Sequence, residues 1–561
     1  MDIKKIRIFL WVIFAFVLVV LWTQWQQGHQ PAQGHNGASQ MAQARTVNSD
    51  GSQSQLSPNL DMGHTVSNTV PSTSQKTTVS AGKRITVKTN VLHAEINLNG
   101  GNLVAASLLK YPKALHSSQP VQLLATHADK TYVAQSGLIS NLLPKSTIRY
   151  QTVHSHYVLQ QGQKQLLVNL TANVQGIHLL KQYIFKPNDY AVAVRFEVSN
   201  HSGKVFQGRF FGQILRTIPK KSGNFLMSYA NYTGAAVSYP GNHFDKVSFK
   251  DMREQDLHQM SQGGWVAMLQ HYFITAWAPG QQQKNEFYSR IYRHDLYTIG
   301  FAGPMVTIPM GQAKSVGATL YTGPAIAKNL DQVAPYLDKT INYGWLWFIS
   351  ILIFKVMSWI HHYIGNWGWS IVLVTLLIKL IFYPLSAKSY RSMARMRMLQ
   401  PKIKQLKEQF ADDRQKLGKA TMSLYQKEKV NPLGGCLPIV VQIPVFIGLY
   451  YMLMASVELR QAPWVLWIHD LSLHDPYYFL PVLMGFSMYL QQMLNPPMPD
   501  PTQAKVMKAM PIVFTFMFLG FPAGLVLYWL VNNCVSILQQ WYIMRTVTQE
   551  ASQKVSYKKK K

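Results

Sequence analysis

Cysteine and acidic residues are scarce in this chain of 561 residues. Its two cysteines, Cys436 and Cys534, lie within or beside long apolar runs. That number and placement exclude a disulfide framework and a paired-cysteine metal site, so redox chemistry is set aside. Asp and Glu total 24 against 54 Lys and Arg, which gives a formal net charge of +30. Because charged residues make up only 14% and aromatic residues reach 12%, a disordered basic tail protein is excluded as well.

Several catalytic motifs are also missing from the sequence. Gly418 and Lys419 lack the upstream glycine and the following Ser or Thr of a phosphate-binding loop. There is no HExxH motif, and the residues around Ser487 lack the second glycine of a nucleophile elbow. An ATP-driven pump and an intramembrane protease are therefore disfavoured. We expect no enzymatic activity, no catalytic residue, no metal site and no cofactor.

The first 27 residues form a basic segment followed by an apolar one. Lys4, Lys5 and Arg7 precede an apolar run at residues 8–22, as in a signal peptide or a membrane anchor. No small-residue cleavage site follows directly, so an uncleaved transmembrane anchor at residues 1–27, with its N-terminus in the cytoplasm, is favoured. Residues 28–82 are rich in Gln, Ser, Asn and Gly and cannot bury enough apolar surface, so they are predicted to form a flexible tether.

Residues 83–340 contain short β-rich runs separated by turn residues. Residues 191–198 are rich in Val and alternate between apolar and charged side chains from Val194 onward, and Asn99, Gly100 and Gly101 are typical of a turn. This pattern predicts a large all-β sandwich that serves as a binding or scaffolding module. Its histidines have no metal-ligand spacing and are expected to be ordinary surface or core residues; examples are His154, His156, His271 and His294.

A basic loop orients the largely apolar remainder of the chain. Residues 386–431 contain twelve Lys and Arg and four Asp and Glu, so the positive-inside rule places this loop in the cytoplasm. Two apolar runs precede it, at residues 343–364 and 367–385, and only one can span if the β region is outside. The first carries Lys355, Ser358 and His362 on one stripe, which predicts an interfacial amphipathic helix at residues 341–365. In the alternative, both runs span as a hairpin, which would place the basic loop outside.

Three further apolar stretches complete the predicted membrane core. Residues 433–457 and 477–494 are each expected to span, and residues 509–542 form either one kinked span or two short ones. A proline-rich loop is predicted at residues 495–508. Its Lys505 and Lys508 and the basic residues after residue 542 all favour the cytoplasm, so the number of spans between them must be even. We therefore predict an α-helical polytopic core of six transmembrane helices, with both termini cytoplasmic and residues 28–342 periplasmic. The predicted parts are a five-helix core at 366–545, a cytoplasmic helical hairpin at 386–432 and a basic tail at 546–561.

Lys379 is the one charge embedded in an apolar run of this core. A lysine at the centre of a spanning helix costs ~2.5 kcal/mol or more, so it should face protein or water. The alternative is snorkelling past Pro384 to the inner headgroups. Thr375 lies one turn earlier on the same face. Polar residues on three other helices predict either a shared wet cavity or separate interhelical hydrogen bonds; they are Gln442, Gln491, Gln492, Asn532 and Asn533.

The cytoplasmic loop is predicted to form two helices, at residues 389–410 and 415–429, broken near Asp412, Asp413 and Gly418. Its basic side chains suit an anionic partner such as ribosomal RNA or lipid headgroups. A solvated basic face is the alternative. The contact residues expected here are Arg391, Arg395, Arg397 and Lys402.

Several motifs in the core occur in the order found in one known family. They are Tyr383-Pro384-Leu385, Met396-Arg397-Met398-Leu399-Gln400-Pro401-Lys402, Asn431-Pro432-Leu433-Gly434-Gly435-Cys436, Gln442-Ile443-Pro444, Glu458-Leu459-Arg460-Gln461-Ala462-Pro463 and Phe521-Pro522-Ala523-Gly524-Leu525. With these motifs the chain closely resembles the YidC/Oxa/Alb family of membrane protein insertases, most strongly over residues 343–544. The resemblance implies a bacterial inner-membrane protein that inserts and helps to fold nascent membrane proteins, alone or with the Sec translocon. It also implies a periplasmic β-sandwich and a cytoplasm-open hydrophilic groove formed by five helices. The implied partners are nascent membrane proteins, the Sec translocon with its accessory subunits, the ribosome, a targeting receptor and membrane lipids, but no DNA.

The resemblance also implies roles for individual residues. The family's groove carries one essential positive residue, usually Arg, and the matching position here is Lys379, which keeps the charge without the five-donor fork. Lys379 would attract the acidic groups of a substrate's hydrophilic tail. The substrate-contacting aromatic residue of the last helix falls at Trp529. The remaining implied groove and substrate contacts are Thr375, Gln442, Tyr528, Asn532 and Asn533.

An ion-coupled transporter with Lys379 as its ion site is the alternative from another functional class. Two sequence features argue against it. The membrane segments offer no acidic partner for Lys379, and the chain has no inverted repeat.

Overall fold

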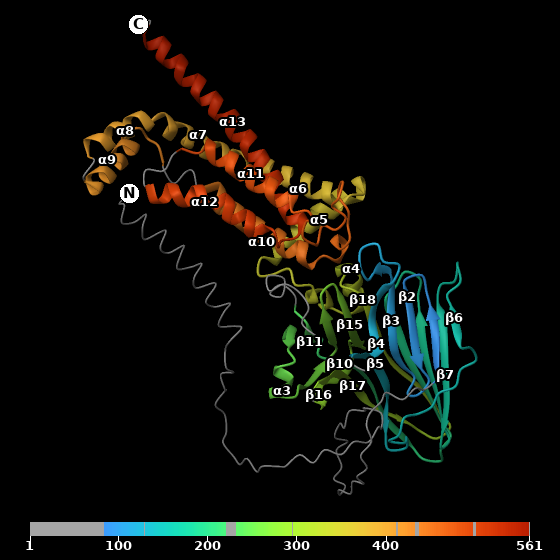
Figure 1. Ribbon diagram of the computed structural model, residues 1–561. Coiled ribbons are helices and arrows are strands. Elements are labelled where there is room, and N and C mark those ends of the chain that lie inside the picture. The colour runs from blue at the N-terminus through green and yellow to red at the C-terminus, as the bar shows by residue number, and fades with distance from the viewer. Residues whose placement is uncertain are drawn as a thin grey trace, which may run out of the picture. The chain divides into compact units, whose positions relative to one another are not determined.

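The structure is a computed structural model, and the predicted anchor and tether lie outside the residues that it describes. His294 and Cys436 lie outside them as well. Figure 1 traces the strands from blue to green and the helices that follow them from yellow to red. The described residues are 83–127, 130–219, 232–293, 295–410, 413–431, 437–496 and 501–559.

Ten of the described strands form one sheet, in which β1 and β6 pair in parallel and the other neighbours are antiparallel. In spatial order they are β13 (His258–Gln262), β16 (Lys284–Arg293), β17 (Leu296–Ile308), β10 (Phe206–Thr217), β5 (Lys130–Ser140), β4 (Pro120–His127), β3 (Asn102–Pro112), β2 (Leu92–Asn97), β1 (Arg84–Lys88) and β6 (His156–Val158).

Eight further strands form a second, antiparallel sheet within the described residues. In spatial order they are β12 (Asn242–Val247), β11 (Gly234–Tyr239), β14 (Trp265–Gln270), β15 (Phe273–Pro279), β18 (Ala313–Pro324), β9 (Ala191–Asn200), β8 (Ile177–Phe185) and β7 (Leu166–Val174). Strand β9 shows why these segments are strands. Val194, Phe196 and Val198 are buried while Arg195 and Glu197 are exposed, which is the alternation of a strand with one face on the core.

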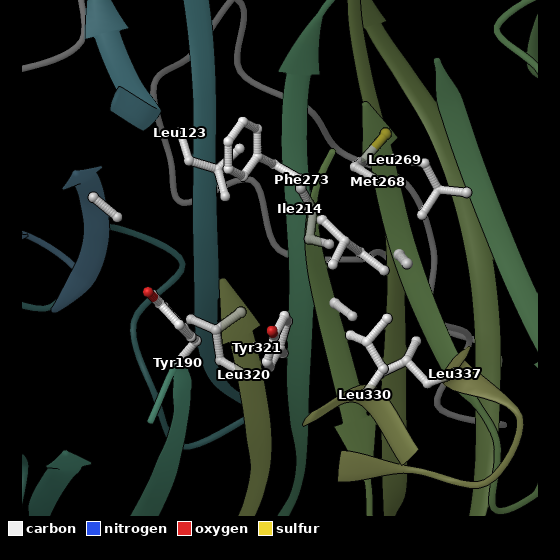
Figure 2. Packing of buried hydrophobic residues seen from close by; sticks show 14 of the residues in the cluster. Leu123, Tyr190, Ile214, Met268, Leu269, Phe273, Leu320, Tyr321, Leu330 and Leu337 are labelled. Carbon is white, nitrogen blue, oxygen red and sulfur yellow. The ribbon is translucent and has the colours of Figure 1, made fainter. Parts of the chain in front are cut away.

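Aromatic and aliphatic side chains from both sheets fill the space between them. Phe210 on β10 lies 5.6 Å, ring centre to ring centre, from Phe196 on β9, and 6.4 Å from Trp277 on β15. The indole N–H of Trp277 donates to the carbonyl of Gln213 on β10 at 3.2 Å, which joins the two sheets directly. Figure 2 shows the same interior around Ile214. The predicted all-β sandwich is confirmed.

Lys181 on β8 is buried in this interior, with 0% of its surface exposed. Its ammonium donates to the carbonyls of Ser136 at 2.8 Å and Gly100 at 3.4 Å. The rings of Phe196 and Tyr183 lie 5.1 and 5.4 Å from the nitrogen. No carboxylate among the described residues forms an ion pair with it. Burial therefore lowers the pKa of the Lys181 ammonium well below its usual range.

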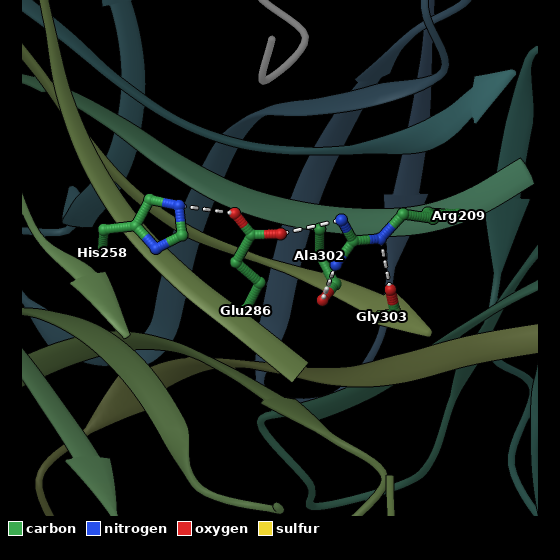
Figure 3. A network of polar contacts seen from close by, with 5 residues as sticks. All are labelled: Arg209, His258, Glu286, Ala302 and Gly303. Carbon is green, nitrogen blue, oxygen red and sulfur yellow. Dashed lines mark hydrogen bonds and ion pairs between the residues drawn. The ribbon is translucent and has the colours of Figure 1, made fainter. Parts of the chain in front are cut away.

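A second polar network lies at a bulge of the ten-stranded sheet (Figure 3). Glu286 on β16 accepts from the Arg209 guanidinium at 2.7 Å and lies 3.1 Å from the ring of His258 on β13. Arg209 also donates to the carbonyls of Gly303 at 2.7 Å and Ala302 at 3.3 Å. The register of β10 against β17 shifts beside Arg209, so its guanidinium satisfies carbonyls at the irregularity.

Helices occupy the rest of the described chain. They are α3 (Asp251–Glu254), α4 (Ala327–Val333), η1 (Leu337–Thr340), α5 (Trp347–Ile364), α6 (Trp367–Ile381), α7 (Tyr383–Met398), α8 (Gln400–Gln409), α9 (Arg414–Lys427), α10 (Leu437–Ala455), η3 (Val457–Leu459), α11 (Phe479–Leu494), α12 (Pro501–Phe518) and α13 (Ala523–Lys559).

The helix boundaries can be compared with several sequence predictions. Gly418 does not break the hairpin, because α9 runs through it without interruption. Lys505 and Lys508 lie in α12 rather than in a loop, because Pro501 starts that helix. Residues 509–542 contain two helices, as one of the two alternatives predicted. The core boundary predicted at residue 545 falls inside α13, which continues to Lys559.

Length and composition identify few helices that could cross a membrane by themselves. Among the described residues α5 alone is long and apolar enough to cross a membrane by itself. The pair of α6 and α7, which is bent by 68°, is long and apolar enough only if the two helices form one span. The apolar parts of α10 and α11 are shorter, at Val440–Ala455 and Phe479–Leu494. The count of six spans therefore stays a prediction.

Helix α5 buries one stripe, which includes Ile353, Met357 and Ile360. Of its predicted polar stripe, Lys355 and His362 are exposed. The hydroxyl of Ser358 is buried and finds no hydrogen-bond partner among the described residues. Trp345, Trp347, Trp359 and Tyr363, in and just before the helix, are all more than half exposed. Exposed aromatic residues of this kind are typical of a membrane interface.

Candidate functional site: a polar layer around Lys379

Helix α6 carries Lys379 in its last turn. The helix starts at the cap residue Asn366, whose side chain accepts from the backbone N–H of Trp369. It ends at Ile381, and Pro384 in the first turn of α7 accompanies the bend of 68° between the two helices. Lys379 therefore lies at the C-terminal end of α6, where the helix dipole favours a cation.

The side chain of Lys379 faces the protein. It is 8% exposed, and its ammonium donates to the hydroxyl of Ser536 on α13 at 2.7 Å. No ion pair joins Lys379 to a carboxylate in the part of the chain that the structure describes. This geometry fits a lysine that faces protein rather than one that snorkels, and the predicted cavity stays a prediction.

Ser536 was not among the predicted site residues. Its signal in the sequence is its spacing, since Asn532, Ser536 and Gln540 recur every four residues and so share one face of α13. All three are buried in the structure. A single Ser, Asn or Gln in a helix is ordinary, so the pattern becomes visible only when the three are taken together.

Gln442 on α10 contacts the same face of α13. Its amide donates to the side-chain oxygen of Asn532, and to the hydroxyl of Tyr528 at 3.4 Å. The hydroxyl of Ser536 in turn donates to the backbone carbonyl of Asn532 at 2.7 Å. Lys379, Gln442, Tyr528 and Asn532 are thus linked by hydrogen bonds between helices that meet at one face of α13, and the shared wet cavity stays a prediction. We call these four residues and Ser536 the polar layer.

Other predicted site residues face elsewhere. Asn533 donates to the hydroxyl of Ser487 on α11 at 2.9 Å, which is an ordinary interhelical hydrogen bond. The hydroxyl of Thr375 donates to the carbonyl of Ile371 in its own helix at 2.6 Å. Gln491 and Gln492 are half-buried near the end of α11.

Trp529 lies among aromatic rings. Its ring centre is 4.8 Å from that of Phe446 on α10 and 5.4 Å from that of Phe518 on α12. Its indole N–H is buried and finds no partner among the described residues. Trp529 therefore contributes apolar surface beside the polar layer.

The hairpin presents its basic residues to solvent. Arg391, Arg395 and Arg397 are exposed and make no ion pair with the described residues. Lys402 differs, because its ammonium pairs with Glu428 at 2.6 Å and so ties α8 to the end of α9. A small apolar cluster holds the two arms together; its buried members are Met396, Leu399, Ile403, Tyr425 and Val430.

Comparison with known proteins places this architecture in a class. One family model, described as the YidC periplasmic domain, matches residues 84–356, and another, described as 60Kd inner membrane protein, matches residues 359–551. The class is therefore that of inner-membrane proteins with a periplasmic β domain.

Close relatives define the family. The chain is 44% identical over 554 residues to "Membrane protein insertase YidC" of Coxiella burnetii (strain Dugway 5J108-111), a match that covers 97% of each chain. It is 45% identical over 560 residues to the protein of the same name from Pseudomonas entomophila (strain L48), covering 98% of each. The chain belongs to the YidC family of membrane protein insertases. This confirms the resemblance, and the alternative of an ion-coupled transporter is not supported.

A solved structure described as "Active YidC insertase crystal structure with the first transmembrane domain resolved" is similar over 83% of this chain and 93% of that one. Its sequence identity is 19% and its TM-score is 0.39. The assignment to the family depends on the family models and the close relatives.

Proposed function

We propose that this chain inserts and helps to fold nascent proteins of the bacterial inner membrane, with the polar layer receiving the hydrophilic tail of the substrate. The observation that carries the proposal is the environment of Lys379. It is a buried cation whose ammonium donates to the hydroxyl of Ser536, without a carboxylate partner among the described residues.

A buried cation without a counter-ion attracts an incoming anion. An ammonium has three N–H donors, and Ser536 accepts from one of them. Acidic groups of a substrate tail lose part of their hydration when they leave water, and charge attraction together with polar groups offsets that cost. Gln442, Tyr528 and Asn532 supply such polar groups on or against the same face of α13 that Lys379 contacts through Ser536.

The apolar segment of the substrate supplies the driving force for its own insertion. Moving apolar surface from water into lipid is favourable by roughly 25 cal/mol for each Å², so a spanning segment needs no coupled reaction. Within this proposal the chain lowers the barrier for the polar tail, and no cofactor is required.

Topology and partners complete the proposal. Residues 1–27 anchor the chain, and six spans leave both termini and the hairpin in the cytoplasm. Helix α5 lies at the outer interface, which its exposed tryptophans support. The exposed hairpin arginines support electrostatic docking of the ribosome or a targeting receptor. The chain acts alone or together with the Sec translocon and its accessory subunits.

The test is the insertion of a single-span substrate with an acidic tail. Lys379→Arg should retain activity because the charge is kept, whereas Lys379→Ala and Lys379→Glu should fail although the folded protein accumulates. Lys355→Ala, which removes an exposed lysine from α5, is the matched control and should be fully active. Full activity of Lys379→Ala would overturn the role of the groove charge.

A further inference from the structure

We infer that Ser536 is a positioning residue, which holds the ammonium of Lys379 at the place where it receives acidic groups of a substrate. The inference rests on the proposed function. It concerns a residue on α13, more than 150 positions after Lys379 in the chain.

The hydroxyl of Ser536 donates one hydrogen bond and accepts another, and the two have different partners. A serine hydroxyl has one proton and two lone pairs. Its proton is committed to the carbonyl of Asn532 at 2.7 Å, so it offers only lone pairs to its other neighbours. One neighbour is the ammonium of Lys379 at 2.7 Å.

Ser536 therefore joins two helices at one atom. Lys379 comes from the last turn of α6 and Ser536 from α13. Both side chains are buried, with 8% and 2% of their surface exposed. Because the hydroxyl proton is already used, Ser536 cannot donate to a substrate itself. Its effect on the substrate passes through Lys379.

Lysine needs such a holder more than arginine does. Its ammonium sits on a flexible four-carbon stem, whereas the guanidinium of arginine presents a preorganised fork. Without an acceptor at position 536 the ammonium of Lys379 loses its hydrogen-bond partner on α13 and samples other rotamers. Capture of acidic groups should then weaken, while substrates that do not use the charge should be unaffected.

The experiment compares two substrates in the full-length protein, reconstituted in vesicles of phosphatidylethanolamine and phosphatidylglycerol. One single-span substrate has an acidic tail, and the other has the same tail with Gln and Asn in place of the acidic residues. Ser536→Ala should reduce insertion of the acidic-tailed substrate by about tenfold, the scale of losing one hydrogen bond to a charged group. Ser536→Thr keeps the hydroxyl and should restore insertion. The neutral-tailed substrate should insert normally with both variants.

Ser487→Ala is the matched control. It removes the serine that accepts from Asn533 and so breaks a similar buried contact between helices without touching Lys379. An equal loss for both substrates in Ser536→Ala, or the same acid-specific loss in Ser487→Ala, would overturn the inference. If Ser536→Ala does not accumulate as folded protein, Ser536→Cys, which keeps the size with a weaker acceptor, takes its place and should show an intermediate acid-specific loss. Unchanged insertion of the acidic-tailed substrate by Ser536→Cys would also overturn the inference.

The two proposals fail in different ways. If Lys379→Ala inserts the acidic-tailed substrate normally, the groove charge itself is refuted. If Lys379→Ala fails and Ser536→Ala does not, the groove charge stands and only the positioning role is refuted.

Discussion

Replacing Lys181 by methionine tests how the β-sandwich tolerates a buried amine. The lysine is fully buried on β8, and burial holds the pKa of its ammonium well below the usual 10.5. In the unfolded chain the same group returns to water and regains its ordinary proton affinity. The unfolded state thus binds one proton more than the folded state at every pH between the two pKa values. Stability must therefore rise with pH below 10.5 and fall as the solution is acidified toward the folded pKa.

The size of the effect follows from this difference of one proton. Each pH unit changes the free energy of unfolding by about 1.4 kcal/mol per proton, so the step from about pH 8.5 to about pH 10 adds about 2 kcal/mol. A domain of this size responds by about 2–4 °C in Tm for each kcal/mol, which gives about 4–8 °C. Lys181→Met lacks the titrating group, so its Tm should not show this additional rise between about pH 8.5 and about pH 10. Because methionine leaves the carbonyls of Gly100 and Ser136 without their donor, Lys181→Met also loses a contribution to Tm that does not depend on pH.

The assay is thermal unfolding of the full-length protein in detergent, followed by circular dichroism at the wavelength where strands dominate. Other groups titrate in this range too, so the quantity of interest is the difference in slope between the variant and the native chain. Lys186→Met, an exposed lysine just beyond the same strand, is the control and should keep the native slope. Parallel curves of Tm against pH for Lys181→Met and the native chain would refute the reasoning.

Three further predictions concern the ion pair, the hairpin and the topology. Glu286→Gln should lower the free energy of unfolding by about 3 kcal/mol, since it leaves a largely buried guanidinium unpaired, whereas Glu254→Gln at an exposed pair should cost less than about 0.5 kcal/mol. Equal effects in urea denaturation would contradict this. Neutralising the three exposed hairpin arginines should weaken ribosome binding and flatten the slope of log affinity against log salt by about 2; an unchanged slope would leave the hairpin a structural role. A cysteine at Leu466, which is 77% exposed, should react with an impermeant reagent from outside, and one at Lys404 should not. The reverse labelling would overturn the proposed topology.

Alternation along the strands made the sandwich predictable, but it could not give the order of the strands. Strand β9 buries every second residue, which is visible in its sequence. Pairings such as β5 with β10 join segments about 70 residues apart, and such long-range contacts leave no local signal. Lys181 shows a further limit. Alternation on β8 places it on the inner face with Leu179 and Tyr183, although lysine is almost never fully buried.

The wrong predictions in the helical region have a common physical cause, which is that a single glycine or proline does not always end a helix. Glycine in a helix costs only about 1 kcal/mol relative to alanine, so packing in the hairpin outweighs it at Gly418. Proline is tolerated in the first turn, and Pro501 starts α12 where the sequence suggested a loop. Lys379 was predictable because a charge in an apolar run is rare. Ser536 was not, because its role depends on which helix packs opposite.

The length of α13 gives the C-terminal segment an unexpected mechanical property. Its 37 residues extend ~56 Å at 1.5 Å per residue, nearly twice the ~30 Å of a bilayer core. After Gly524 its sequence contains neither proline nor glycine, the residues at which sharp kinks usually arise. From Ser536 to Lys559 is ~35 Å along one uninterrupted rod. The basic C-terminal end of α13 is thus a rigid spacer, and a partner that binds this end is held at a set distance from the ammonium of Lys379.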